Sequence, residues 1–361
     1  MTSLRPKNTQ KTLVARKGGR WEIEERALIP ALREGEVMIR VMAIALNPSD
    51  VKQLDLTPIE GAVCGCDLSG IVTDMSKTNI SKSLRIGDHV SSFVFGCNPN
   101  RPDNGAFSEY VVVRSEFCIR LPKSIDFAEG SSFGVGLVTC GLALRSLKLI
   151  NDSGEATKNN FGEMVLVYGG STATGTLAIQ LLHQLGYNPV ATSSPHNFSL
   201  LREYGATAVF DYNNTACGVE IRNYTKNHLN RVLDCIGNNQ STTISYEAIG
   251  TLGGRYTSVA PFPGRLVLRR KQVHPDWILG YTVFGDDVRF DDTYKKTADP
   301  KDGIFTSIWI LKMEKLLASG CIKSHPIQLR EDGLRGIVRD ADLLRHQKVS
   351  GHKLVYVMQD Y

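Results

Sequence analysis

The sequence predicts an α/β protein with two domains, one rich in antiparallel strands and one built on a doubly wound parallel sheet. Short strand-like segments broken by Gly and Pro fill the first third of the chain. Strand-like and helix-like segments then alternate from residue 163 to residue 260, which is the rhythm of repeated βαβ units. The 361 residues, 42% of them hydrophobic, are enough to bury two cores.

The first third contains four strand-like segments, at residues 36–50, 69–75, 85–96 and 105–113. They are short and separated by turn residues, which favours antiparallel pairing. Apolar residues at helical spacing predict a helix over residues 136–150. The polar residues 151–160 follow it and are expected to form a connector at a domain boundary.

The middle of the chain predicts a Rossmann-type parallel sheet with helices on both faces. Its strand-like segments are residues 163–170, 188–194, 207–212, 231–237 and 254–260, and the helix-like segments between the first of them are residues 174–186 and 197–206. The charged residues 285–303 are expected to be irregular. A helix over residues 304–320 and a closing strand over residues 353–358 are expected to rejoin the first domain.

The turn after the first of these strands resembles a dinucleotide-binding fingerprint. Gly170, Thr172 and Gly175 occupy the three glycine offsets of G-x-G-x-x-G. Thr172 departs from the pattern, but its hydroxyl and those of Ser171 and Thr174 can donate to phosphate oxygens at a helix N-terminus. Small residues at such a turn are also a common packing solution, so the motif alone leaves both interpretations open.

The end of the second strand indicates which dinucleotide would bind. NAD enzymes place an acidic residue there to bind the ribose 2′-hydroxyl, but this strand ends VATSSPHN, without an acid. Ser193, Ser194, His196 and Asn197 offer donors and no negative charge, which suits a 2′-phosphate. The alternative is an ordinary polar loop.

Charge and cysteine content exclude several classes of protein. The net charge of +5 is spread along the chain, which argues against nucleic-acid binding and leaves an acidic ligand or partner open. Eight cysteines without a repeated spacing, set in apolar runs, favour reduced thiols. The first 20 residues are basic, as in a transit peptide, but they lack an apolar core. No apolar run looks long enough to span a bilayer, and we expect a cytoplasmic protein.

Several motifs along the chain resemble a known family. VMAIALNPSDVK, RIGDHV, GAFSEYVVV, the glycine turn, REYGATAVFDY and SGHKLVYVM are similar to medium-chain dehydrogenase/reductases of the zinc-independent, quinone-oxidoreductase-like branch. NPSDVK, VYGGSTATGT, SPHNF, VFDY, YTKNHL, LDCI and SGHKLV more closely resemble the trans-acting enoyl reductases of fungal polyketide synthases, the lovastatin enoyl reductase type. STAT followed by SPHN is an unusual pairing and therefore fairly specific.

The resemblance implies an architecture and a reaction. Residues 1–158 and 300–361 would form a GroES-like, β-rich catalytic domain around a Rossmann domain of residues 159–299, with NADPH in the cleft. The enzyme would reduce an α,β-unsaturated acyl thioester held on the acyl carrier domain of a highly reducing polyketide synthase, in secondary metabolite biosynthesis. Two alternatives stay open: an NADPH-dependent reductase of quinones or free enones, and an NADPH-binding protein without useful turnover.

The same resemblance implies the site residues. Contacts with NADPH are expected from Ser49, Asp50, Val51, Lys52, Ser171, Thr172, Ala173, Thr174, Ser194, Pro195, His196, Asn197, Tyr212, Ser350 and Gly351. The substrate is expected along Ser132, Phe133, Gly134, Val135, Gly136, Leu137, Val138 and Thr139 and near Phe284 and Gly285, where Gly134 and Gly136 would leave room for an acyl chain. Residues 281–303 depart from the lovastatin-type pattern in length and charge, which puts substrate shape in doubt.

The zinc ligands of related dehydrogenases are not matched. Asn47 stands in the place of the first cysteine, and Gly65, Cys66 and Asp67 stand in the place of Gly-His-Glu. Cys64, Cys66 and Asp67 form a metal-like cluster in sequence, but no second pair matches it, and buried packing thiols are the interpretation we favour. We expect no metal.

Other catalytic classes lack their motifs, which leaves hydride transfer. No tyrosine has a lysine four residues on, and no Gly-x-Ser-x-Gly elbow follows a strand. Reduction of an enoyl thioester needs donors where the enolate oxygen forms, and Lys52 and Thr139 are our candidates. Lys52 could instead contact the cofactor ribose or be a surface charge, and Thr139 could be a helix N-cap. Water could supply the α proton.

Charged segments bear on assembly and partners. Residues 283–303 follow the region through which many relatives pair, and their charges could blunt a sheet edge, so we expect a monomer. Arg269, Arg270 and Lys271 could help to dock an acidic carrier or could form an ordinary solvated face.

Overall fold

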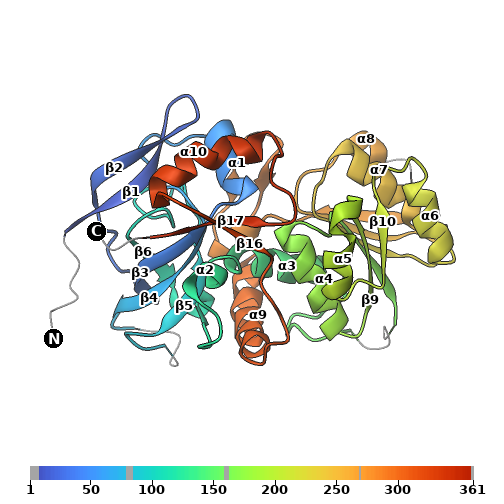
Figure 1. Ribbon diagram of the computed structural model, residues 1–361, viewed down its shortest axis with the longest axis horizontal. Helices are drawn as coiled ribbons and strands as arrows, with labels where there is room; N and C mark the ends of the chain where they lie inside the picture. The colour runs from blue at the N-terminus through green and yellow to red at the C-terminus, as the bar shows by residue number, and fades with distance from the viewer. Residues whose placement is uncertain (1–7, 79–83, 158–161, 268–269, 359–361) are drawn as a thin grey trace.

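The computed structural model describes residues 8–78, 84–157, 162–267 and 270–358. Figure 1 shows two lobes: the beginning and the end of the chain form one, and the middle forms the other. The boundary expected at residues 158 and 159 lies outside the described residues.

The middle lobe contains a six-stranded parallel sheet in the order β10-β9-β8-β11-β12-β13. Its strands are β8 (Met164–Tyr168), β9 (Asn188–Ser193), β10 (Ala208–Asp211), β11 (Arg231–Asp234), β12 (Gly254–Ser258) and β13 (Val273–Trp277). This is the order of a doubly wound nucleotide-binding sheet, with the strand order reversing beside β8. The predicted fold class is therefore confirmed. The strand β13 was not anticipated.

Both faces of this sheet are buried, and its central strand β8 is apolar throughout. Val165 and Val167 of β8 face a core shared with α3 and α4, whereas Leu166 and Tyr168 face a second core shared with α6 and α7. The helices of this lobe are α4 (Ala173–Gln184), α5 (Phe198–Glu203), α6 (Cys217–Tyr224), α7 (Asn239–Ala248) and the short α8 (Gly264–Val267), with a 3-10 turn η2 (Pro195–Asn197). Apolar residues on both faces are what parallel sheets require.

The other lobe is built on a largely antiparallel sheet that uses both ends of the chain. The strand order is β16-β17-β3-β4-β5-β7, and β6 pairs with β3. Its strands are β3 (Glu36–Ala45), β4 (Asp67–Met75), β5 (His89–Phe93), β6 (Tyr110–Arg114), β7 (Ile119–Arg120), β16 (Ile327–Arg330) and β17 (Lys353–Val357). The antiparallel pairing of β17 with β3 returns the C-terminal segment to the first part of the chain.

Further elements of this lobe include several that the sequence patterns did not predict. They are the hairpin of β1 (Thr9–Arg16) and β2 (Arg20–Leu28), the helices α1 (Pro48–Leu56), α2 (Phe127–Gly130) and α10 (Gly333–Arg345), and the turn η1 (Ser115–Phe117). Residues 36–50 are not one strand, because β3 ends at Ala45 and Pro48 begins α1. Proline is favoured at that first helical position because its missing N–H has no partner there.

Two helices join the lobes, α3 (Gly134–Ser146) and α9 (Pro300–Ala318). The buried Trp309 of α9 stacks on Phe305, and its indole N–H donates to the carbonyl of Leu137 over 2.9 Å. Residues Phe127–Ser146 have the length and hydropathy of a membrane span, but 83% of that stretch is buried inside the protein. These residues form α2 and α3 and belong to the core of the fold.

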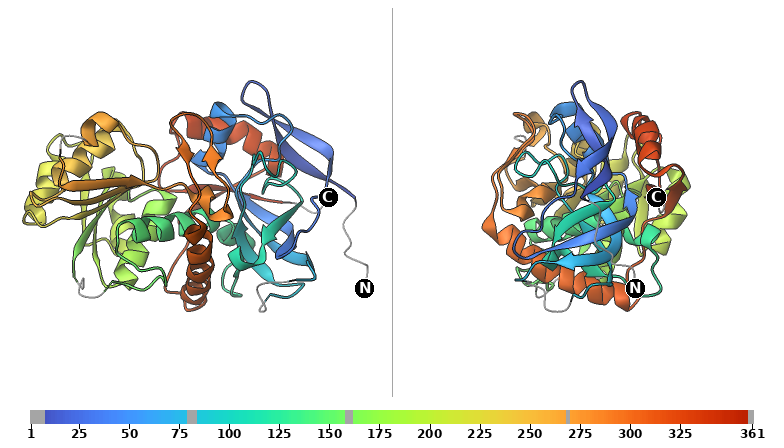
Figure 2. Two further views of the ribbon diagram at one scale, coloured as in Figure 1. Left: turned by 180° about the vertical axis from the view of Figure 1, so that it is seen from behind. Right: turned by 90° about the vertical axis from the view of Figure 1, so that its left-hand side faces the viewer.

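Residues 280–296 form an ordered strap, although the sequence suggested an irregular stretch from residue 285. A turn η3 (Gly280–Phe284) leads into a short hairpin of β14 (Val288–Arg289) and β15 (Lys295–Lys296). Figure 2 shows the orange hairpin strands between the two lobes. The strap packs through Tyr281 and Val288 against Cys66 and Phe95 of the other lobe.

Candidate functional site

The glycine turn links β8 to α4 and is tightly closed. Gly169 has φ +74, and a Cβ on Gly175 would overlap the carbonyl oxygen of Gly169. A Cβ on Gly170 would lie 2.9 Å from that of Ala191 on the neighbouring strand. The hydroxyl of Thr172 caps α4 by accepting from the N–H of Gly175 over 2.9 Å. Thr172 therefore supports the helix N-terminus, where a phosphate would be favoured by the helix dipole.

A polar cluster lies beyond the end of β9. The hydroxyls of Ser194 and Tyr212 are 2.9 Å apart, which joins the ends of β9 and β10. The side-chain amide of Asn197 donates to the hydroxyl of Ser350 over 3.3 Å, and Nε2 of His196 lies 3.3 Å from the same hydroxyl. Residues more than 150 positions apart are thus brought together.

The turn at Ser350 and Gly351 fits this cluster closely. Gly351 has φ +70, and a Cβ there would lie 2.6 Å from Oδ1 of Asn197. A larger residue at position 351 would therefore be strained twice, because its backbone would be left-handed and its Cβ would overlap Asn197. The donors of the cluster and the α4 N-terminus together suit a phosphorylated dinucleotide. None of its members, Ser194, Pro195, His196, Asn197, Tyr212 and Ser350, carries a negative charge.

A buried polar network occupies the region where the zinc ligands of related dehydrogenases would be expected. The ammonium of Lys353 on β17 contacts Oδ2 of Asp67 over 2.5 Å and Oδ1 of Asn47 over 2.8 Å. The amide of Asn47 donates to Asp67, and Oδ1 of Asp67 accepts from the backbone N–H of Val135 at the start of α3. Asp67 is 0% exposed and Lys353 5%.

The cysteines beside this network are buried packing residues. Burial raises the pKa of the Cys66 thiol well above its usual value, and its sulfur lies 3.2 Å from the hydroxyl of Tyr281. Within the described ranges, no three His, Cys, Asp or Glu side chains are grouped so that they could hold a metal ion. That the reaction needs no metal stays a prediction.

Helix α1 carries four of the predicted cofactor residues on different faces. Asp50 and Val51 are buried, and a carboxylate oxygen of Asp50 accepts from the N–H of Asn47 over 2.8 Å to close the helix start. Ser49 is half-buried and Lys52 is exposed. The contribution of Asp50 and Val51 in this structure is thus to hold α1, whereas Lys52 faces outward.

The predicted substrate segment runs through α3, and most of it is buried. A Cβ on Gly134 would lie 2.6 Å from the carbonyl oxygen of Ser92, and one on Gly136 would lie 2.7 Å from Leu177. These glycines let α3 approach its neighbours closely, and the space beside them is filled by protein. Of the eight residues 132–139, only Val135 is half-buried, and it packs beside the strap.

Thr139 lies in the middle of α3, five residues after its start, so the N-cap alternative is wrong. It is 9% exposed, and a Cβ on Gly280 of the strap would lie 3.8 Å from its hydroxyl oxygen. Phe284 packs edge-on against Phe93 and Phe117, and its carbonyl accepts from Arg114. Gly285, with φ +89, borders open space.

The patterns missed three residues that shape this region. Lys353 belongs to the SGHKLV motif but gave no signal of pairing with Asp67, because 286 positions separate them. Tyr294 contacts Lys52 from the hairpin. His325 is 2% exposed and lies 3.0 Å from the hydroxyl of Thr176 on α4, and burial lowers its pKa to about 3.

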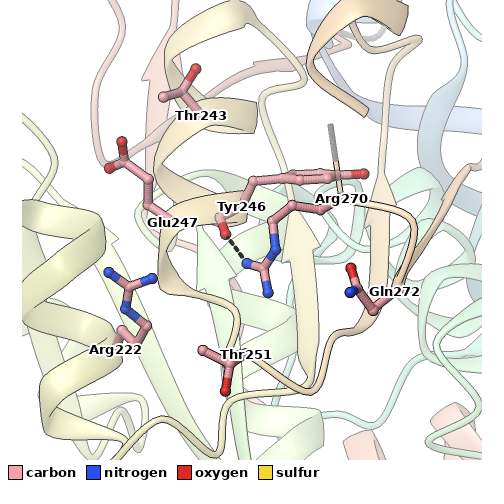
Figure 3. Close-up of a pocket in the computed structure, with 7 residues that line it drawn as sticks. All are labelled: Arg222, Thr243, Tyr246, Glu247, Thr251, Arg270 and Gln272. Carbon is pink, nitrogen blue, oxygen red and sulfur yellow. Dashed lines mark hydrogen bonds between the residues drawn. The ribbon is translucent and has the colours of Figure 1, made fainter. Parts of the chain in front are cut away.

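The cavity shown in Figure 3 lies away from these residues, beside α6 and α7. It measures about 470 Å³ and includes Arg222 and Arg270 in its lining. Arg270 donates to the carbonyls of Tyr246, Ile249 and Gly250 and so closes the end of α7. Arg270 is therefore not an ordinary solvated residue, and Arg269 lies outside the described residues.

Comparison with known proteins identifies the class. A family model for the alcohol dehydrogenase GroES-like domain matches residues 33–123, and one for zinc-binding dehydrogenases matches residues 173–297. The quinone oxidoreductase from Coxiella burnetii superposes with a TM-score of 0.71 at 21% identity, covering 97% of this chain and 99% of that one. The CurK enoyl reductase has a TM-score of 0.74 at 17% identity, covering 97% and 100%. The fold is that of the medium-chain dehydrogenase/reductases, a class of oxidoreductases that use a nicotinamide cofactor.

Sequence relatives define the family within this class. A trans-enoyl reductase from Penicillium oxalicum is 40% identical over 359 residues, 98% of either chain. One from Aspergillus niger is 41% identical over 356 residues, 97% of either chain. The protein belongs to the trans-enoyl reductase family and is an oxidoreductase.

The Lys353–Asp67 pair generates a first prediction. Replacing Lys353 with Met leaves the Asp67 carboxylate buried without its partner, which should lower the free energy of unfolding by about 3–5 kcal/mol. Adding Asp67→Asn removes the unpaired charge and should restore part of the loss. Guanidinium unfolding of both variants tests this, and equal stability of Lys353→Met and wild type would contradict it.

The buried Asp50 generates a second prediction, which concerns the pH dependence of the free energy of unfolding. Burial raises the pKa of Asp50 to about 7, so the folded state holds a proton that the unfolded state releases near pH 4. Its contribution to stability should therefore fall as pH rises from 4 to 7, by at most about 1.4 kcal/mol per pH unit, and level off above 7. Asp50→Asn should lack this decline relative to wild type.

Urea unfolding at a series of pH values measures the difference between Asp50→Asn and wild type. The exposed Asp74→Asn is the control for loss of a carboxylate. Parallel pH profiles for wild type and Asp50→Asn would show that Asp50 titrates normally.

Proposed function

We propose that this protein is an NADPH-dependent, trans-acting enoyl reductase of polyketide biosynthesis. Its substrate would be an α,β-unsaturated acyl thioester carried on the acyl carrier domain of a highly reducing polyketide synthase, in the cytoplasm. The observation that carries the proposal is the identity of about 40% over nearly the full length of two proteins named trans-enoyl reductases. The polar cluster and the glycine turn support the cofactor.

The residues present fit a phosphorylated dinucleotide. The close approach that Gly170 and Gly175 permit, together with the N-terminus of α4, suits a pyrophosphate. Ser194, Tyr212 and Ser350 offer hydroxyls at the end of β9, where a ribose 2′-phosphate would lie in this fold. When bound, the nicotinamide supplies the hydride, which is the difficult part of the chemistry.

The chain's own residues would stabilise the charge that the reduction creates. Addition of hydride to the β carbon moves negative charge to the thioester carbonyl oxygen, and fixed donors at that position lower the barrier. We assign this role to Lys52, which is exposed on α1, and to Thr139, whose hydroxyl borders the strap at Gly280. The α carbon would take its proton from water.

A monomer is part of the proposal. The strand β13 ends the parallel sheet, and Pro275 at its centre has no N–H to offer a second strand. His274, Pro275 and Asp276 are exposed along this strand. A proline at this position disfavours pairing of two copies through β13.

Cofactor preference provides a third prediction. Ser194→Asp would place a carboxylate beside the 2′-phosphate and should weaken NADPH binding about tenfold or more, while NADH binding is not weakened. Calorimetric titration with both cofactors measures this, and Ser194→Ala controls for loss of the hydroxyl. Equal affinity of the wild type for NADPH and NADH would contradict the assignment.

The proposed substrate provides a fourth prediction. The purified protein with NADPH should reduce the carbon–carbon double bond of pantetheine-linked and carrier-linked enoyl thioesters and leave the thioester carbonyl intact. Mass spectrometry of the product distinguishes the two sites of reduction. Rapid reduction of free quinones without turnover of any enoyl thioester would support the alternative reductase, and no turnover of either would support a binding protein.

The double variant Lys52→Ala, Thr139→Ala is the matched control for that assay. It should lower turnover more than NADPH affinity, since one lost oxyanion donor typically costs about 3 kcal/mol of barrier. An equal loss of turnover and cofactor affinity would remove these residues from the chemical step.

A further inference from the structure

We propose that Tyr294 is a positioning residue that holds the Lys52 ammonium in the candidate site. This inference rests on the proposed function, in which Lys52 stabilises the enolate oxygen. The hydroxyl of Tyr294 lies 3.5 Å from Nζ of Lys52, and Nζ lies 5.7 Å from the centre of the Tyr294 ring. The phenol thus offers the ammonium a hydrogen-bond acceptor and an aromatic ring.

The contact joins two segments that lie far apart in the chain. Lys52 is on α1, beside the antiparallel sheet, whereas Tyr294 is in the hairpin that follows the parallel sheet, 242 positions later. The same strap borders Thr139 at Gly280. One segment therefore adjoins both candidate donors, and a displacement of the strap would move the surroundings of both.

The hairpin is held firmly enough to place a side chain. Oδ1 of Asp291 accepts from the backbone N–H groups of Thr293 and Tyr294, and the carbonyl of Tyr294 accepts from the N–H of Phe290. The Tyr294 ring packs edge-on against Trp277 at the end of β13. These contacts fix the backbone of Tyr294 and one side of its ring.

The hairpin is also anchored in the lobe that contains the antiparallel sheet. Phe290 packs edge-on against Phe95 and Tyr281, and Val288 is buried in the same aromatic cluster. The phenol is thereby presented to Lys52 from an anchored support. A lysine on an exposed helix face otherwise samples many rotamers, so a fixed partner reduces the entropy lost when its ammonium meets the substrate.

Chemical labelling tests the contact without turnover. Limiting acetylation with an N-hydroxysuccinimide ester, followed by peptide mass spectrometry, gives the reaction rate of Lys52 relative to the exposed Lys301. Tyr294→Ala should raise the relative rate about fivefold, which corresponds to one hydrogen bond of ordinary strength. Thr293→Ala in the same hairpin is the control and should leave the rate unchanged.

A kinetic cycle tests the role. Tyr294→Phe should lower kcat about fivefold, with KM and NADPH affinity unchanged, because only the hydrogen bond to Lys52 is lost. In a Lys52→Ala background, Tyr294→Phe should have no further effect, since a positioning residue acts through its partner. Thr293→Ala should retain wild-type kcat, and unchanged melting temperatures would exclude a general loss of structure.

Two results would overturn the inference: an unchanged Lys52 labelling rate in Tyr294→Ala, or independent, additive losses of kcat in the cycle. A wild type that reduces no enoyl thioester, while the labelling rates change as expected, would instead overturn the proposed function and leave the contact established.

Discussion

The buried ion pair between Lys353 and Asp67 is the interaction on which the candidate site depends. Two charges removed from water must be paired and hydrogen-bonded, and this requirement fixes four segments at one point. The four hydrogen-bonded residues belong to these segments: Lys353 to β17, Asp67 to β4, Asn47 to the start of α1 and Val135 to the start of α3. Because Lys52 lies on α1 and Thr139 on α3, both candidate donors are positioned from this pair.

The C-terminal segment also ties the cofactor region to the rest of the protein. His325 contacts Thr176 of α4, and Gln180 on the same helix exchanges hydrogen bonds with the backbone of Lys323. Farther along, Ser350 meets His196 and Asn197 beyond β9. Burial lowers the pKa of His325 to about 3, so its imidazole is neutral across the physiological range. The N-terminus of α4 and the cluster beyond β9 are therefore each braced from outside the parallel sheet.

The strap of residues 280–296 is held in place by a few apolar residues and one aspartate. Its charges suggested an irregular segment, yet Val288 and Phe290 bury apolar surface in the aromatic cluster, and Asp291 closes the hairpin. Asp287, Arg289, Asp292 and Lys295 are exposed, so most of the charge of the strap stays in solvent. The segment lies beside both Lys52 and Thr139, so a change in it would alter the surroundings of both side chains.

The sequence by itself determined the features that depend on local pattern. Alternation of apolar strands and helices predicted the parallel sheet, and the spacing of Gly170, Thr172 and Gly175 predicted a tight turn into a helix, because both follow from neighbouring residues. Sequence patterns gave a wrong expectation where the residues that lie next to each other in the fold are far apart in the chain. Gly134 and Gly136 suggested room for a ligand, but Ser92 and Leu177 fill that space.

Only the tertiary structure decided which separated residues meet. The pairing of Lys353 with Asp67, of Tyr294 with Lys52 and of Ser350 with Asn197 joins positions that no periodicity relates. Nor could sequence tell that the Asp50 side chain would turn inward to cap α1 while Lys52, two residues later, is exposed and meets Tyr294. Such contacts arise because burial of apolar faces brings whole elements together, and the polar groups left between them then need partners.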